Sequence, residues 1–188
     1  MLTIPNLLTL LRLLAVPVFI FASLRGELML AFVLFIGAAF TDMFDGMIAR
    51  RFNQRSRLGA ILDPAADKTM LVCGYLFYTL YDNVALVRIP AWLTFTVFIR
   101  DFLIILFAYL LWTRVQVKRF PPSWAGKTST VLQAVTLGVV IGVNAFVPSL
   151  LWLAELMFRI ALIATLVSGW DYMRRAKRML GDAFAAAA

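Results

Sequence analysis

TDMFDGMIARRFNQRSRLGAILDPAADK, residues 41–68, places four aspartates between two long apolar runs. They are Asp42, Asp45, Asp63 and Asp67. A carboxylate at membrane depth costs several kcal/mol unless it is paired or binds a cation. The four aspartates form two helically spaced pairs, so one explanation should account for the cost of all of them. That explanation bears on both the fold and the chemistry of the chain.

The composition of the chain is that of a membrane protein. Of its 188 residues, 63% are hydrophobic and 15% are charged, and a soluble domain of this size is less apolar. We predict one all-α integral membrane domain over 1–188, with a core at 4–172 and a basic tail at 173–188, because helices satisfy their own backbone hydrogen bonds in lipid. The single cysteine excludes an intrachain disulfide, and the lack of histidine excludes His-ligated metals and histidine-based catalysis.

Six apolar segments are long enough to cross a bilayer, which takes about 20 residues. The first carries Arg12 and lacks both the basic start and the cleavage site of a signal peptide, so we expect it to be retained as a helix. The six predicted transmembrane helices are 4–24, 28–49, 58–80, 90–113, 125–147 and 150–172.

Lysine and arginine gather on one side of these segments, in the connections 50–57 and 114–124 and in the tail 173–188. The short loops on the other side offer only Arg25 and Arg88. Basic residues favour the cytoplasmic face, so we predict that both termini and the 50–57 loop are cytoplasmic. Topology and attraction to anionic lipid headgroups account for the formal net charge of +8, and nothing points to a nucleic-acid partner.

The spacing of the aspartates brings them together. Asp42 and Asp45 are three apart near the end of one predicted helix, so they share a helix face. Asp63 and Asp67 are four apart near the start of the next and share a face in the same way. Four converging carboxylates repel strongly unless cations bind between them, and oxygen ligands favour Mg²⁺, Mn²⁺ or Ca²⁺. Two such metals, about 3.5–4 Å apart, are a recurring device of phosphoryl transfer.

The residues around the aspartates suit a substrate that carries phosphate. Gly46 follows Asp45, and Gly59 precedes Asp63 by four. Glycine costs a helix about 1 kcal/mol relative to alanine, but it lets a ligand approach the backbone closely. Arg50 offers a guanidinium that can fork onto a phosphate. Taken singly, the glycines suit helix packing and the arginine suits topology, but their fixed spacing from the aspartates favours a phosphate site.

The chain resembles the CDP-alcohol phosphotransferase (CDP-alcohol phosphatidyltransferase) family, whose signature it matches at every position: Asp42-x-x-Asp45-Gly46-x-x-Ala49-Arg50, eight residues, then Gly59-x-x-x-Asp63-x-x-x-Asp67. The opening Ile4-Pro5-Asn6-x-x-Thr9-x-x-Arg12 resembles the first helix of the family. Three further elements resemble the branch that makes phosphatidylglycerophosphate and cardiolipin: Arg100-Asp101, Gly126-Lys127 and Ser168-Gly169-Trp170-Asp171-Tyr172. The likeness thus covers most of the chain and is most specific at 41–68.

This resemblance implies six transmembrane helices around a polar cavity that is open to the cytoplasm, in a homodimer in the bacterial inner membrane. It implies two divalent cations, Mg²⁺ or Mn²⁺, held by the four aspartates, with Asp45 bridging them and Asp67 also acting as general base. It further implies a CDP pocket lined by Asn6, Gly46, Ala49, Arg50 and Gly59.

The implied reaction transfers a phosphatidyl group from CDP-diacylglycerol to an alcohol. The acceptor hydroxyl gives its proton to Asp67 and attacks the β-phosphorus, and CMP leaves. The resemblance favours glycerol-3-phosphate as the acceptor, giving phosphatidylglycerophosphate, and the alternative is phosphatidylglycerol, as in cardiolipin synthesis.

Two basic residues at membrane depth, Arg100 and Lys127, are candidates for binding the phosphate of the acceptor. The alternative for Arg100 is an ion pair with Asp101 or with one of the signature aspartates, and for Lys127 it is snorkelling to the membrane surface. A different class of protein, a divalent-cation transporter, also needs carboxylates in the membrane. Transport needs no phosphate cradle, however, so the glycines and arginine of the signature favour the enzyme.

Overall fold

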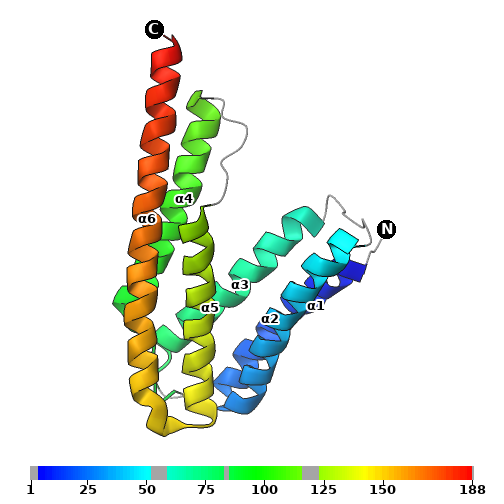
Figure 1. The fold of residues 1–188 in the computed structure, drawn as a ribbon. Helices are drawn as coiled ribbons and strands as arrows, with labels where there is room; N and C mark the ends of the chain where they lie inside the picture. The colour runs from blue at the N-terminus through cyan, green and yellow to red at the C-terminus, as the bar shows by residue number, and fades with distance from the viewer. Residues whose placement is uncertain (1–3, 52–58, 83–84, 116–122, 188) are drawn as a thin grey trace. The chain divides into compact units, whose positions relative to one another are not determined.

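The computed structural model describes residues 4–51, 59–82, 85–115 and 123–187 (Figure 1). Within these ranges, side chains are described at 10–41, 68–82, 85–110, 113 and 123–179. The described chain is helical and contains no strand. Its elements are α1 (Ile4–Leu24), α2 (Leu28–Arg51), α3 (Gly59–Leu80), α4 (Ala91–Val115), α5 (Trp124–Ala145), the short 3₁₀-helix η1 (Pro148–Leu150) and α6 (Leu151–Ala187).

The first five helices confirm the predicted segments to within a few residues, and the sixth does not end where we expected. The sixth segment was predicted to cross the membrane over 150–172, and α6 continues as a helix to Ala187, so residues 173–187 of the basic tail are helical, and their place in the cytoplasm stays a prediction. Alanine, arginine, lysine, methionine and leucine dominate the tail, and these residues have high helix propensity.

Three helices are long and apolar enough to cross a membrane by length and composition. These candidate spans are Ala91–Leu110, Trp124–Ala145 and Pro148–Met179. Shorter apolar stretches lie at Leu10–Leu24 and Leu28–Thr41. These findings cover only the described residues, so the count of six spans stays a prediction, whereas the membrane character of the chain is supported.

The chain divides into two compact units, and α5 and α6 contribute to both. The first unit comprises Met1–Ile89 with Leu137–Ala154, and the second comprises Pro90–Thr136 with Glu155–Ala188. The prediction of one membrane domain over 1–188 is not tested by this division.

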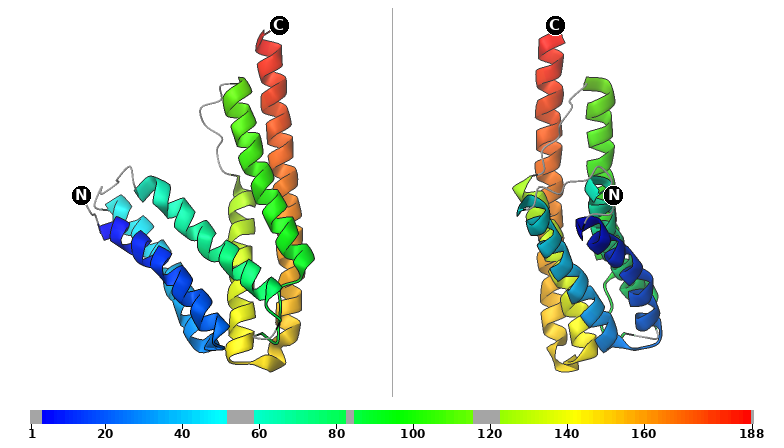
Figure 2. Two further views of the ribbon diagram at one scale, coloured as in Figure 1. Left: turned by 180° about the vertical axis from the view of Figure 1, so that it is seen from behind. Right: turned by 90° about the vertical axis from the view of Figure 1, so that its right-hand side faces the viewer.

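In the first unit α1 packs against α2 and α3 (Figure 2), and aromatic rings of α1 and α2 lie close to one another. Phe19 on α1 is fully buried, and its ring centroid lies 6.4 Å from that of Phe35 on α2. Gly138 and Gly142 leave room for rings of α2, because an added Cβ would come within 3.3 Å of Phe35 and 3.1 Å of Phe32. Small residues of this kind allow close helix packing in membranes.

Two connections of the first unit are fixed by hydrogen bonds. Gly26, with a φ of 75°, turns the chain from α1 into α2, a left-handed conformation that favours glycine. Beyond α3, the side chain of Asn144 accepts from the Val87 amide and donates to its carbonyl, each at 2.9 Å. The Ile89 amide donates to the Tyr78 carbonyl at 2.9 Å. The chain is therefore held where it enters α4.

In the second unit a buried polar cluster joins α5 to α6. The amide nitrogen of Gln133 donates to the hydroxyls of Ser129 and Thr165, both at 3.2 Å. The two hydroxyls lie 3.4 Å apart, and all three residues are almost fully buried. Side-chain hydrogen bonds between helices contribute modestly to association in membranes, about 0.6 kcal/mol on average, so this cluster fixes which faces of α5 and α6 meet.

Candidate functional site

Apart from Asn6 on α1, the predicted metal and nucleotide ligands lie on two consecutive helices, at the C-terminal end of α2 and the N-terminal end of α3. The described backbone is helical at all of them: Asp42, Asp45, Gly46, Ala49, Arg50, Gly59, Asp63 and Asp67. Helical backbone puts residues three or four apart on one face, as their spacing predicted. Their side chains, like that of Asn6 on α1, lie outside the described residues, so their convergence on metal ions stays a prediction.

The chemistry of this donor set fits the implied cations. Carboxylate oxygens suit Mg²⁺ and Mn²⁺, and the chain has no histidine that would favour a softer metal. Among the side chains that the structure describes, no group of three or more acidic residues or cysteines could hold a metal. The four aspartates of the signature therefore remain the candidate ligands.

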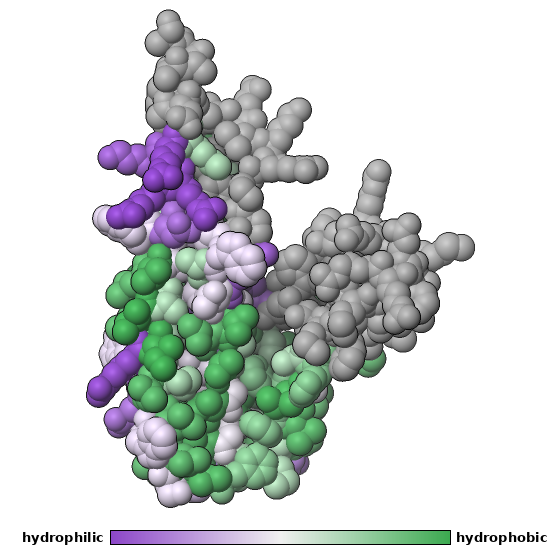
Figure 3. Space-filling model, in the orientation of Figure 1, coloured by the Kyte–Doolittle hydropathy of each residue, from purple (hydrophilic) through white to green (hydrophobic). Residues whose placement is uncertain are grey.

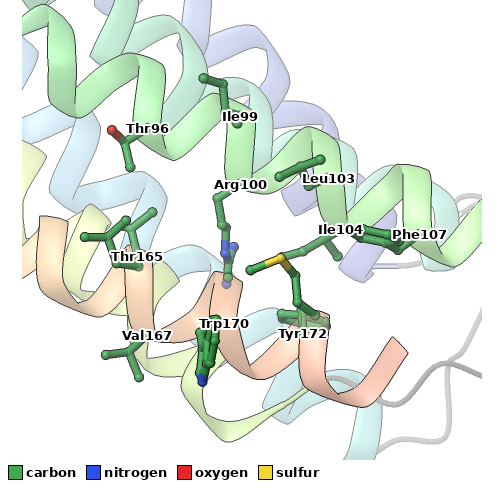
Figure 4. Close-up of a pocket in the computed structure, with 13 residues that line it drawn as sticks. Thr96, Ile99, Arg100, Leu103, Ile104, Phe107, Thr165, Val167, Trp170 and Tyr172 are labelled. Atoms are coloured by element: carbon green, nitrogen blue, oxygen red, sulfur yellow. The ribbon is translucent and has the colours of Figure 1, made fainter. Parts of the chain in front are cut away.

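Arg100 on α4 points toward α6 (Figure 4) and makes several polar contacts within the second unit. It is only 6% exposed, as expected for a basic residue at membrane depth that faces the protein interior. Its Nη1 contacts Asp101 Oδ1 at 2.6 Å. Its Nε donates to Ser168 Oγ at 3.1 Å, and its Nη2 donates to the same hydroxyl and, at 3.3 Å, to the Gly126 carbonyl. One guanidinium thus joins α4, α5 and α6.

The start of α5 is built around Gly126. Ser123 caps the helix, because its Oγ accepts from the Gly126 amide at 2.9 Å, the usual role of serine at this position. The Ser123 amide in turn donates to the hydroxyl of Tyr172 at 3.4 Å. An added Cβ at Gly126 would lie 2.9 Å from both the ring and the hydroxyl of Tyr172, so this close approach requires glycine.

Lys127 follows Gly126 directly and differs from Arg100 in its surroundings. Its side chain is exposed, and Nζ lies 5.4 Å from the centroid of the Trp124 ring. Arg100, by contrast, lies 5.7 Å from the ring centroid of Tyr172 and is surrounded by protein. Of the two predicted phosphate-binding cations, only Lys127 presents its charge to the outside of the second unit.

Three short elements that the sequence singled out separately therefore meet in space: Arg100-Asp101, Gly126-Lys127 and Ser168 to Tyr172. The alternative of an ion pair between Arg100 and Asp101 is confirmed as a contact, and it does not test binding of the acceptor. Sequence reasoning missed Ser123, whose signal was a serine just before a helix, and it missed the bonding of Ser168 to Arg100, which no spacing could indicate.

The sequence matches a known family over most of its length. Residues 2–170 match the profile of the family described as CDP-alcohol phosphatidyltransferase. The matched range includes every predicted site residue, from Asn6 to Lys127.

Three relatives illustrate the similarity. A "Probable phosphatidylglycerophosphate synthase" from Mycobacterium tuberculosis strain H37Rv is 32% identical over 94% of this chain and 82% of its own length. A "CDP-diacylglycerol--glycerol-3-phosphate 3-phosphatidyltransferase" from Shigella flexneri is 34% identical over 95% of this chain and 97% of its own. One of the same name from Salmonella typhimurium is 32% identical over 95% and 96%.

Proposed function

This chain belongs to the CDP-alcohol phosphatidyltransferase family, and on this premise we propose that it transfers a phosphatidyl group from CDP-diacylglycerol to glycerol-3-phosphate. The products are phosphatidylglycerophosphate and CMP. The observation that supports this proposal most strongly is that relatives matching 94–95% of this chain have names that specify this acceptor or this product. Family membership confirms the prediction of an enzyme and gives no support to the cation transporter.

In the proposed reaction Asp67 accepts the proton of the acceptor hydroxyl. The hydroxyl oxygen then forms a bond to the β-phosphorus of CDP-diacylglycerol, the bond from that phosphorus to the bridging oxygen breaks, and CMP carries the bridging oxygen away. A hydroxyl is a weak nucleophile until a base activates it. Arg50 offsets the charge of the departing CMP, since charge stabilisation and positioning account for most catalysis of phosphoryl transfer.

The residues of the signature also assign the binding sites of the CDP moiety and of the cations. The CDP moiety lies among Asn6, Gly46, Ala49, Arg50 and Gly59. Asp42, Asp45, Asp63 and Asp67 hold two divalent cations, Mg²⁺ or Mn²⁺, which supply charge neutralisation at the entering and leaving oxygens. What supports this proposal is the all-carboxylate donor set on helical backbone.

The contacts in the second unit favour different roles for Lys127 and Arg100 in binding the acceptor. Lys127 is exposed, so we assign it the contact with the phosphate of glycerol-3-phosphate. Arg100 is buried and bonded to protein groups, so we assign it the positioning of Gly126 and hence of Lys127. This assignment refines the expectation that both cations touch the phosphate.

We propose the membrane arrangement as well. Six helices cross the bacterial inner membrane around a polar cavity that is open to the cytoplasm. Both termini lie in the cytoplasm and the enzyme is a homodimer. The support is the one-sided distribution of lysine and arginine together with the three long apolar helices.

The test of the reaction is direct. The purified protein receives CDP-diacylglycerol and Mg²⁺ or Mn²⁺, with glycerol-3-phosphate and phosphatidylglycerol supplied separately. We expect CMP release with glycerol-3-phosphate, and mass spectrometry should identify phosphatidylglycerophosphate. Cardiolipin formed from phosphatidylglycerol would instead show that the proposed acceptor is wrong, and no CMP release with either acceptor would refute the proposed transfer.

The role of Lys127 makes a separate prediction. Lys127→Gln should raise the KM for glycerol-3-phosphate by about tenfold or more, because a hydrogen bond to a charged group contributes about 1.5–3 kcal/mol. The kcat should change little, since the phosphate contact is made equally in the ground state and the transition state. Steady-state kinetics measure both. Lys177→Gln, another exposed lysine, is the control, and an equal KM in the two variants would contradict the assignment.

A further inference from the structure

A groove of about 630 Å³ runs between α4 and α6 in the second unit (Figure 4). Its walls are mostly apolar, with Ile99, Ile104 and Phe107 on α4 facing Val167, Trp170 and Met173 on α6. Its volume falls within the range of about 300–1,000 Å³ typical of sites for small ligands. None of its residues belongs to the signature at 42–67, and of the residues that line it only Arg100 has a role in the proposed reaction.

Both walls belong to helices that are long and apolar enough to cross a membrane. Several wall residues are strongly exposed, including Ile99 at 57% and Trp170 at 56%. In a bilayer such a groove meets acyl chains, so an acyl chain is the chemistry that its walls fit.

One end of the groove is strongly basic. Residues 171–178 contain four basic residues and one acidic residue, and Figure 3 shows the surface of α6 changing from green to purple toward this end. The guanidinium of Arg174 lies 5.0 Å from the ring centroid of Trp170, which lines the groove. Arg175 is bonded to Asp171 at 3.1 Å, whereas Lys177 and Arg178 are exposed.

The apolar walls and the basic end together fit a ligand that has both an apolar chain and an anionic group. We propose that the groove binds a phospholipid with an anionic headgroup, its acyl chain lying between α4 and α6 and its phosphate at Arg174. The predicted topology puts this end of α6 at the cytoplasmic surface, where anionic lipids attract basic segments and tryptophan anchors at the interface. The inference does not depend on the acceptor or on the reaction, and its failure would leave both intact.

The experiment uses Trp170 as the reporter. The protein in detergent micelles is titrated with acyl-brominated phosphatidylglycerol or acyl-brominated phosphatidylcholine, and tryptophan fluorescence is recorded. The contribution of Trp170 is the difference between the parent protein and Trp170→Phe. We expect half-quenching at about fivefold lower mole fraction of the anionic lipid, the preference that one basic residue provides near anionic lipid. Salt of about 1 M, where the Debye length is about 3 Å, should reduce this preference.

Arg174→Gln should bring the ratio of the two half-quenching mole fractions close to one, and Arg174→Lys should keep most of the preference for the anionic lipid. Arg25→Gln is the matched control, because Arg25 also lies over a ring four residues earlier, 4.4 Å from the centroid of Phe21, yet it is far from the groove in sequence and belongs to the first unit. Equal quenching by the two lipids in the parent protein would overturn the proposal. So would quenching by neither lipid, with Ile99→Cys chains cross-linking in pairs, since a second copy would then cover the groove.

Discussion

Replacing Asp67 by asparagine should abolish phosphatidyl transfer while binding of CDP-diacylglycerol stays measurable. Asparagine has nearly the same shape and keeps an oxygen that can face a cation, but it cannot accept a proton. General bases contribute typically about 10²–10⁴-fold to rate, so CMP release should fall by at least that factor. Binding is measured as stabilisation of the protein by CDP-diacylglycerol, because a ligand that binds only the folded state raises Tm.

Asp67 is also a proposed metal ligand, and the two roles can be separated. If the loss came only from weaker metal binding, raising the concentration of Mg²⁺ or Mn²⁺ would restore turnover to the variant. If Asp67 is the base, saturating metal restores binding of the CDP-lipid but not CMP release. Asp82→Asn is the control, since Asp82 lies outside the signature, just after α3, with an exposed side chain paired with Arg88. Turnover by Asp67→Asn close to that of this control would refute the assignment.

The positions of the helices could be predicted from sequence because the apolar runs are long and are separated by connections that contain charged residues, glycine or proline. The end of α6 could not be predicted in the same way. Hydropathy marks where a helix leaves the membrane, whereas α6 continues as a helix through Arg174 and Lys177, whose propensity favours helix in water as well. The structural end of a helix and its membrane boundary are set by different physical effects.

The candidate site, too, could be predicted only in part from the sequence. The aspartate pairs could be predicted because spacing within a single helix determines which residues share a face. The contacts around Arg100 depend on how different helices pack. Ser123 and Tyr172 are 49 positions apart and meet through one hydrogen bond, and only the spatial arrangement explains why Gly126 has no room for a side chain. Local periodicity carries no information about such contacts.

Replacing Arg100 by leucine should destabilise the protein by about 3–5 kcal/mol, the usual effect of removing one partner of a buried ion pair. The change removes the contact of Arg100 with Asp101, whose side chain is 19% exposed, and it removes the bonds to Ser168 and Gly126. For a chain of this length each kcal/mol lowers Tm by about 2–4 °C. Thermal unfolding in detergent micelles, followed by circular dichroism, measures the difference.

The chain offers a matched comparison in the ion pair of Arg88 and Asp82. The residue types are the same, but these side chains are 49% and 70% exposed, against 7% and 19% for Arg100 and Asp101. Exposed pairs contribute only about 0.2–1 kcal/mol, so Arg88→Leu should lower Tm far less. Adding Asp101→Asn to Arg100→Leu should recover part of the loss, because the second change removes the charge left behind. Strictly additive effects would show that the two residues are not coupled.

Arg100→Lys distinguishes a positioning role from a merely structural one. Lysine keeps the charge beside Asp101 but lacks the planar fork, so it cannot hold the Ser168 hydroxyl and the Gly126 carbonyl together. If Arg100 positions Lys127, this variant should raise the KM for glycerol-3-phosphate severalfold while the KM for CDP-diacylglycerol and the kcat stay near those of the parent. A variant that loses stability with no change in either KM would show that Arg100 joins the three helices without affecting the acceptor.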